Sequence, residues 1–205
     1  MDPEVAANTA AAADVFRAAG AVVEAVELPW SREQIMDLTY IHFGAVFGAE
    51  IGLAAAEYPD LITPYAARIA ERSLEAIGRT PYAEGLRMEA EVYAPLGDLL
   101  ECYEILVCPT VGTRGYVAGD DYADHGIEVG GELLDDYLAA SMTPAFNIAS
   151  RCPVLAVPSG FASNGVPTGI QIVGRTYDDV TVFRAGAAYE RERQWFDVIE
   201  RRPPV

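Results

Sequence analysis

A segment near the carboxyl end of the sequence places two short apolar runs on either side of a turn. The runs are Pro153–Val157 and Gly169–Val173, and Asn164 and Gly165 lie between them. Val, Ile and Leu fill both runs without alternating with polar residues, which is typical of strands buried on both faces. Asn164-Gly165 favours a tight turn, because both residues tolerate a positive φ. We therefore expect two adjoining buried strands, the first ended by Pro158, which has no N–H to donate.

Helix caps and chain breakers divide the rest of the sequence into further elements. The expected helices are Pro3–Gly20, Ser31–Tyr58, Pro64–Gly78, Tyr82–Cys102, Glu132–Ala140 and Asp178–Arg191, and the expected strands are Ala21–Leu28 and Glu104–Cys108. Val111–Asp136 is rich in Gly and Asp, which indicates a loop at the rim of a pocket. Trp195–Val205 is expected to be a loose strand or an extended arm. This order predicts one α/β unit in which helices cover a mixed β-sheet.

Charge and hydropathy argue against several classes of function. The 205 residues include 31 acidic and 14 basic side chains, and the net charge of −17 disfavours nucleic acid and anionic membranes as partners. No apolar run looks long enough to span a membrane, and the acidic start Met1–Glu4 is unlike a signal peptide. All 14 basic residues are arginine. A mechanism that needs a lysine therefore cannot be performed by this chain alone.

The cysteines and histidines do not form the spacing of a metal site. Cys102, Cys108 and Cys152 are an odd number with mostly apolar neighbours, which favours reduced thiols and a cytoplasmic protein. His42 lies near the apolar stripe of its expected helix and is interpreted as a core or groove histidine. His125 stands in an acidic loop, where solvated side chains are a better interpretation than metal ligands. We expect no metal and no cofactor.

The order of residue types from 143 to 175 is more specific than its periodicity. It resembles the C-terminal hallmark of the amidase signature family, which reads T-x-x-x-N, then P-x-x-x-V-P-x-G-F, then G-x-P-x-G-x-Q-x-x-G-R. The matching residues are Thr143, Asn147, Pro153, Val157, Pro158, Gly160, Phe161, Gly165, Pro167, Gly169, Gln171, Gly174 and Arg175. The family's D/E-x-L-x-x-P-T segment is matched by Glu104, Leu106, Pro109 and Thr110. The resemblance covers nearly the whole chain but only the C-terminal half of the family's domain, so 1–205 is expected to be a single partial domain.

The resemblance implies chemistry on amides by groups that this sequence lacks. The family is understood to use a serine nucleophile, a second serine with a cis peptide bond, a lysine base and a Gly/Ser-rich oxyanion loop. An amide carbonyl is a poor electrophile, so its attack needs an activated hydroxyl and donors aimed at the developing oxyanion. Here there is neither a lysine nor a Gly/Ser-rich loop, and Ser159 stands in P-S-G-F rather than in a G-x-S-x-G elbow. We therefore expect no catalytic residue in this chain.

The same resemblance suggests where a substrate would lie. In relatives, residues just before and inside T-x-x-x-N line the acyl side of the substrate site. Here these are Ala140, Met142, Thr143 and Phe146, which we call the acyl-side wall; the alternative is that they are core residues at a helix–loop junction. An apolar wall indicates an apolar or aromatic acyl group. Arg68 corresponds to an arginine that reaches the substrate in some branches of the family, and the alternative is a solvated helix face.

Three functions are consistent with these observations. The first is the C-terminal portion of an amidase that acts on a small-molecule amide together with a catalytic half encoded elsewhere. The second is a catalytically inert binding or interaction module, and the third is a subunit of a glutamine-dependent amidotransferase. Transamidase-type relatives carry an acidic residue about where this sequence has Ala140, which argues against the third. Half of a sheet would expose a strand edge and an apolar face, so a homo-oligomer is a further expectation.

Overall fold

A computed structural model describes residues 1–195 of the chain. Helices outweigh strands, at 54% against 15%, and the mixture confirms the predicted α/β fold class. The chain divides into two compact units, each assembled from separate stretches of sequence. The first unit comprises residues 1–27, 99–115 and 151 onward, and the second comprises 28–98 and 116–150. Each unit has its own core and is described by itself. The expected arm from Trp195 to Val205 lies, after its first residue, outside the described part.

The elements follow the expected order with a few exceptions. The helices are α1 (Pro3–Ala18), α2 (Arg32–Phe43), the π-helical η1 (Gly44–Gly48), α3 (Ala49–Glu57), η2 (Pro59–Leu61), α4 (Pro64–Arg79), α5 (Tyr82–Cys102), η3 (Tyr137–Ala140), α6 (Pro144–Ile148) and α7 (Asp179–Glu192). The strands are β1 (Ile105–Pro109), β2 (Ile127–Val129), β3 (Glu132–Leu134), β4 (Val154–Phe161) and β5 (Pro167–Gly174). The expected caps Asp2, Ser31 and Asp178 each accept a backbone hydrogen bond from the first turn of their helix.

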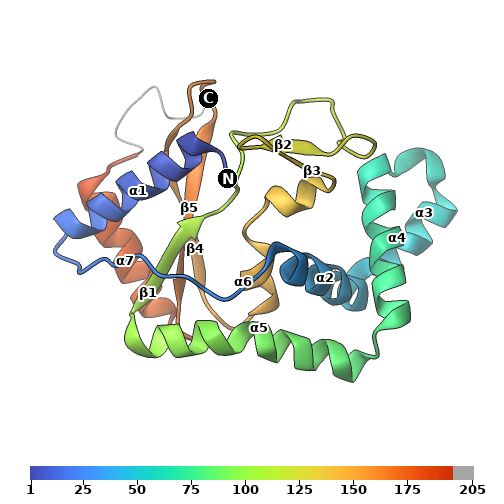
Figure 1. Ribbon diagram of the computed structural model, residues 1–205, viewed down its shortest axis with the longest axis horizontal. Helices are drawn as coiled ribbons and strands as arrows, with labels where there is room; N and C mark the ends of the chain where they lie inside the picture. The colour runs from blue at the N-terminus through green and yellow to red at the C-terminus, as the bar shows by residue number, and fades with distance from the viewer. Residues whose placement is uncertain (196–205) are drawn as a thin grey trace. The chain divides into compact units, whose positions relative to one another are not determined.

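The first unit is built on a three-stranded antiparallel sheet in the order β1-β5-β4 (Figure 1). β4 and β5 are the two adjoining strands expected from the sequence, and Gly165 in the turn between them has a φ of +81°. The prediction that Pro158 ends the first strand is wrong. β4 continues to Phe161 through an irregularity in register between Pro158 and Gly160. A proline is tolerated there because β4 is an edge strand, whose outward N–H groups have no ladder partner.

Helices α1 and α7 cover one face of this sheet (Figure 1). Their buried side chains meet the β5 residues Ile170 and Ile172, which are fully buried, and the β4 residues Leu155 and Val157. Side chains alternate across a strand, so Val154 and Ala156 of β4 point to the other face. Both are exposed. The sheet therefore has one covered face and one face that is open along β4.

The second unit is mainly helical. Helices α2, η1 and α3 form one continuous helical stretch that packs against α4, because Gly44 and Gly48 allow the backbones to approach closely at Ser73. Its largest cluster of buried apolar residues includes Leu38, Ile41, Ala76, Val92 and Ile148. A smaller cluster joins the β2–β3 hairpin to η3.

Two expected elements are wrong. Residues 21–30 form neither helix nor strand, although Ala21–Leu28 has a strand-like composition. The reason is that no strand of the described residues pairs with this stretch, and Val22 is 89% exposed. The helix expected over Glu132–Ala140 begins instead as strand β3 and becomes 3₁₀-helical only at Tyr137. Gly131, with a φ of +84°, closes the tight β2–β3 turn that the sequence analysis interpreted as part of a loop.

The stretch Arg32–Glu57 corrects the expectation that no apolar run is long enough to span a membrane. It is long and apolar enough to cross a membrane by length and composition, with a mean hydropathy of 1.3 over its most apolar window. About a third of that window is buried inside the structure. A core helix meets the same criterion, so the finding carries no assignment to a membrane.

Candidate functional site

The segment that the sequence singled out as the acyl-side wall forms two short helical turns in the second unit. The first is η3, whose start is capped by Asp136: its Oδ1 accepts a hydrogen bond from the backbone N–H of Leu138 at 2.9 Å. The second is α6, in which the N–H groups of Phe146 and Asn147 donate to the carbonyl of Thr143 at 3.0 and 3.1 Å. These turns fix the backbone of residues 137–148.

The four residues of the acyl-side wall do not share one environment. Ala140 is buried in the cluster formed with the β2–β3 hairpin, and Phe146 is buried with its ring edge-on to Trp30, at 5.9 Å between centroids. Met142 is 37% exposed, and the half-buried Thr143 lies with its hydroxyl 3.1 Å from that of Ser141. Met142 and Thr143 are thus the members that a small molecule can reach directly.

Arg68 lines a shallow hollow on the second unit, whose roughly 220 Å³ of empty space includes open solvent. The other lining residues come from α2, α4 and the segment around the β2–β3 hairpin: Tyr40, Tyr65, Ile69, Tyr122, Ala123, Asp135, Asp136 and Tyr137. Arg68 donates a long hydrogen bond of 3.4 Å to the carbonyl of Asp135. The structure brings Arg68 beside the start of η3, but none of the four wall residues lines this hollow.

A buried carboxylate with charged and phenolic partners beside the hollow was not predicted from the sequence. Asp136 is buried, and its Oδ2 lies 2.5 Å from a guanidinium nitrogen of Arg72 and accepts a hydrogen bond from the hydroxyl of Tyr40. The guanidinium of Arg72 also stands 5.7 Å from the centroid of the Tyr40 ring. Burial, together with the negative charge of Asp136, raises the pKa of Tyr40 well above its usual range. Tyr40 therefore stays protonated and acts as a donor to Asp136.

Tyrosine rings make up much of the wall of the hollow. Tyr137 meets Tyr65 and Tyr116 edge-to-face, with ring centroids 5.7 and 6.1 Å apart, and Tyr116 meets Tyr122 in the same way at 5.8 Å. Burial raises the pKa of Tyr137 to about 12. The hollow therefore combines aromatic ring surface with the guanidinium of Arg68 and the carboxylates of Asp135 and Asp136.

Each of the two histidines lies beside a carboxylate. The Nδ1 of His42 lies 2.7 Å from the carboxylate of Glu89, and both side chains are largely buried. The Nε2 of His125 lies 3.1 Å from Asp120 in the loop. His42 thus has a hydrogen-bond partner within the protein, in agreement with its interpretation as a core or groove histidine.

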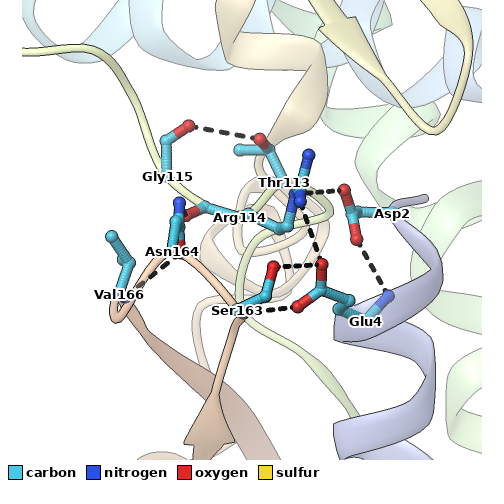
Figure 2. A network of polar contacts seen from close by, with 8 residues as sticks. All are labelled: Asp2, Glu4, Thr113, Arg114, Gly115, Ser163, Asn164 and Val166. Atoms are coloured by element: carbon cyan, nitrogen blue, oxygen red, sulfur yellow. Dashed lines mark hydrogen bonds and ion pairs between the residues drawn. The ribbon is translucent and has the colours of Figure 1, made fainter.

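A polar network in the first unit joins the start of α1 to two loops (Figure 2). The carboxylate of Glu4 accepts hydrogen bonds from the backbone N–H and the hydroxyl of Ser163, at 2.5 and 2.8 Å, and from Arg114 at 2.9 Å. Arg114 also pairs with Asp2, and its carbonyl accepts a hydrogen bond from Asn164. Arg114 pairs with both carboxylates, so the network links the start of α1 to the two loops.

The serine considered as a nucleophile is occupied by its neighbours. Ser159 is fully buried on β4, and its hydroxyl lies 2.8 Å from that of Thr168. Thr168 in turn accepts a hydrogen bond from Asn8 of α1 at 3.0 Å. This arrangement holds α1 against the β4–β5 hairpin and leaves Ser159 unsuited to attack a substrate.

Comparison with known proteins gives consistent matches. The family model described as Amidase matches residues 1–183. A glutamyl-tRNA(Gln) amidotransferase subunit from Thermosynechococcus vestitus is 38% identical over 95 residues, which is 46% of this chain and 18% of that protein. The corresponding protein from Latilactobacillus sakei is 24% identical over 217 residues, which covers 95% of this chain and 42% of that protein.

Solved structures support the fold. A bacterial aryl acylamidase of the amidase signature family aligns with a TM-score of 0.79 over all of this chain and 44% of its own, at 24% identity. The chain spans less than half the length of the curated relatives and of this structure.

Proposed function

Because the chain belongs to the amidase family, we propose that it is the C-terminal portion of an amidase whose nucleophile and base lie outside it. The activity is the hydrolysis of a carbon–nitrogen amide bond by the serine, cis-serine and lysine mechanism of the family. The sequence has no lysine, so this chain cannot supply that base. Its contribution is scaffold and substrate pocket.

The observation that carries this proposal is the position of β4. Its residues have the composition of a strand buried on both faces, yet β4 lies at the edge of the three-stranded sheet, and Val154 is 41% exposed. Exposed apolar edges favour pairing with a further strand, since their N–H and C=O groups have no partners. If the catalytic half added a strand next to β4, that strand would cover this edge.

The candidate wall residues support a proposal about the kind of amide that fits. Met142 and Thr143 are the accessible members of the acyl-side wall, whereas Ala140 and Phe146 are buried. The tyrosine-lined hollow beside Arg68 offers ring surface and one guanidinium. We therefore favour a small-molecule amide with an apolar or aromatic acyl group, with Arg68 available for a polar end of the substrate.

A component of a glutamine-dependent amidotransferase is the second candidate, and its support is the similarity to proteins of that kind. The position of Ala140 argues against it. A carboxylate that recognises glutamine would have to be accessible, whereas the Ala140 side chain is buried among apolar residues. The third candidate, an inert binding module, would keep the fold without any catalytic partner.

Co-expression distinguishes the three functions. The chain is produced together with the Gly/Ser-rich, lysine-bearing segment of an amidase encoded next to it, and the complex is assayed on aryl, aliphatic and glutamine amides. We expect turnover of aryl or aliphatic amides by the complex and none by the 205-residue chain alone. Faster cleavage of glutamine would favour the amidotransferase. Robust turnover by the pure chain, or no complex with any such segment, would contradict the amidase proposal.

The remaining properties are proposed from the composition and the chemistry of the side chains. The three cysteines are free thiols, which fits a reducing compartment, and we propose a cytoplasmic protein. No group of three metal-ligating side chains occurs in the part of the chain that the structure describes, and the proposed mechanism uses no cofactor. The strongly negative charge makes nucleic acid an unsuitable partner.

A further inference from the structure

We propose that Asp136 is a positioning residue whose carboxylate holds the acyl-side wall in place relative to helices α2 and α4. This inference rests on the proposed function. Asp136 touches no group that would react. It acts through the backbone that follows it, from Tyr137 to Phe146. The relevant feature is a buried carboxylate shared by three elements that lie far apart in the sequence.

Both oxygens of this carboxylate are in use. Oδ2 receives the hydroxyl of Tyr40 from α2 and a guanidinium nitrogen of Arg72 from α4, while Oδ1 receives the backbone N–H of Leu138 from η3. Asp136 is only 8% exposed, so its charge depends on these donors instead of on water. The wall segment therefore cannot shift away from α2 and α4 without leaving a buried charge unpaired.

The connection from Asp136 to the wall is a sequence of short backbone hydrogen bonds. The N–H of Ala139 donates to the carbonyl of Asp136, and the N–H of Ser141 donates to that of Leu138, both at 3.0 Å. The hydroxyl of Ser141 then lies 3.1 Å from that of Thr143. A displacement at Asp136 is thus transmitted to Met142 and Thr143, the two accessible members of the wall.

Asp135 provides a matched comparison inside the same turn. It carries the same charge as Asp136 and is adjacent in sequence, but its side chain is exposed. Arg68 is bonded to its backbone carbonyl, which a change of side chain leaves in place. Asp135→Asn therefore removes one negative charge at this position without removing the anchor.

Hydrogen exchange on the 205-residue chain tests the anchor without any assay of activity. For Asp136→Ala we expect the amides of Leu138 and Ser141 to exchange at least tenfold faster, with the amides of α5 unchanged. Arg72→Gln, which keeps the Asp136 cap on Leu138, should show a smaller increase in the same segment, and Asp135→Asn should show none. Unchanged exchange in 137–146, or an increase spread evenly over the second unit, would overturn the proposal.

Kinetics of the complete enzyme test whether the anchor serves the substrate. In the complex with the catalytic half, Asp136→Asn should raise KM about tenfold or more while kcat changes less than threefold, because the chemical groups stay in place. Equal losses in kcat, or an unchanged KM, would overturn the positioning role. If the complex has no amidase activity at all, the proposed function fails, while the exchange result still decides whether Asp136 anchors the segment.

Discussion

Glu4 shows how a single side chain fastens distant segments of the first unit. Its carboxylate joins the first turn of α1 to Ser163 in the β4–β5 turn and to Arg114 after β1 (Figure 2). Hydrogen bonds from the backbone and side chain of Ser163 hold the pKa of Glu4 below its usual value of 4.5. The charged form is therefore favoured in the folded state.

The lowered pKa of Glu4 predicts how stability depends on pH. A carboxyl whose pKa is lowered by folding contributes stability above its unfolded pKa, and the contribution is lost as the pH falls through the folded value. We expect the melting temperature of Glu4→Gln to lie below that of the unchanged protein at pH 6, with the difference shrinking as the pH falls below 4.5 and through the lowered folded pKa. Glu190→Gln, an exposed position on α7, is the control. A difference that stays constant from pH 6 to pH 3 would contradict this assignment.

The cysteines should differ in reactivity by their surroundings. Burial raises the pKa of the Cys108 thiol to about 12, whereas Cys102 is exposed at the end of α5. The thiolate is the nucleophile, so a thiol-specific reagent at pH 8 should label Cys102 rapidly and Cys108 only after unfolding. Mass spectrometry of the labelled peptides measures both rates. Equal labelling of the two in the folded chain would show that Cys108 is accessible.

The sequence indicates a candidate wall segment but not the buried ion pair beside it, and the reason is physical. Residue types from Thr143 to Asn147 follow one another, so a local pattern can identify them. Tyr40, Arg72 and Asp136 come from three elements, and their meeting depends on how α2, α4 and η3 pack. The sequence analysis favoured Arg68, and only the packing shows that Arg72, on the same face of α4, pairs with the buried Asp136.

At the scale of elements, the packing of α4 against the stretch α2–η1–α3 rests on glycine. A Cβ added to Gly44 would lie 2.6 Å from the backbone carbonyl oxygen of Ser73, which is closer than real contacts allow. We expect Gly44→Ala to lower the free energy of unfolding by roughly 1–3 kcal/mol, because the two helices must move apart. Urea denaturation followed by circular dichroism measures the change.

Gly78 on α4 is the matched control for this substitution. A Cβ there meets nothing within 4 Å, and its φ is not positive. Gly78→Ala should stabilise the chain by about 0.5–1 kcal/mol, since alanine loses less conformational freedom in a helix. If both substitutions changed stability equally, close approach at Gly44 would not be the cause.

The elements that sequence reasoning missed are those that depend on partners. Ala21–Leu28 has the residues of a strand, but no described strand lies beside it to form a ladder. Glu132–Leu134 looks like the start of a helix by composition, yet it pairs with Ile127–Val129 across a tight glycine turn. Long periodic segments such as α5 were predicted with their bounds, because their pattern is contained in their own sequence.

At the scale of the whole molecule, two properties act against each other in solution. A net charge of −17 makes copies of the chain repel one another. The exposed, apolar edge of β4 favours association, since its backbone groups can pair with another strand. Salt screens charge over about 10 Å at 0.1 M, so it weakens the repulsion and leaves the edge attraction in place.

We therefore predict that the isolated chain self-associates through β4. Sedimentation should give a mass above the 22.1 kDa of one chain, rising with salt concentration. Val154→Lys places a charge on the exposed edge and should restore the monomer, because charged edge residues oppose strand pairing. Val180→Lys makes the same change of charge at a 60% exposed position on α7 and should leave association unaltered. A monodisperse monomer at every protein and salt concentration would mean that the β4 edge is stable when exposed to solvent. It would then no longer support the proposal that further strands complete this sheet.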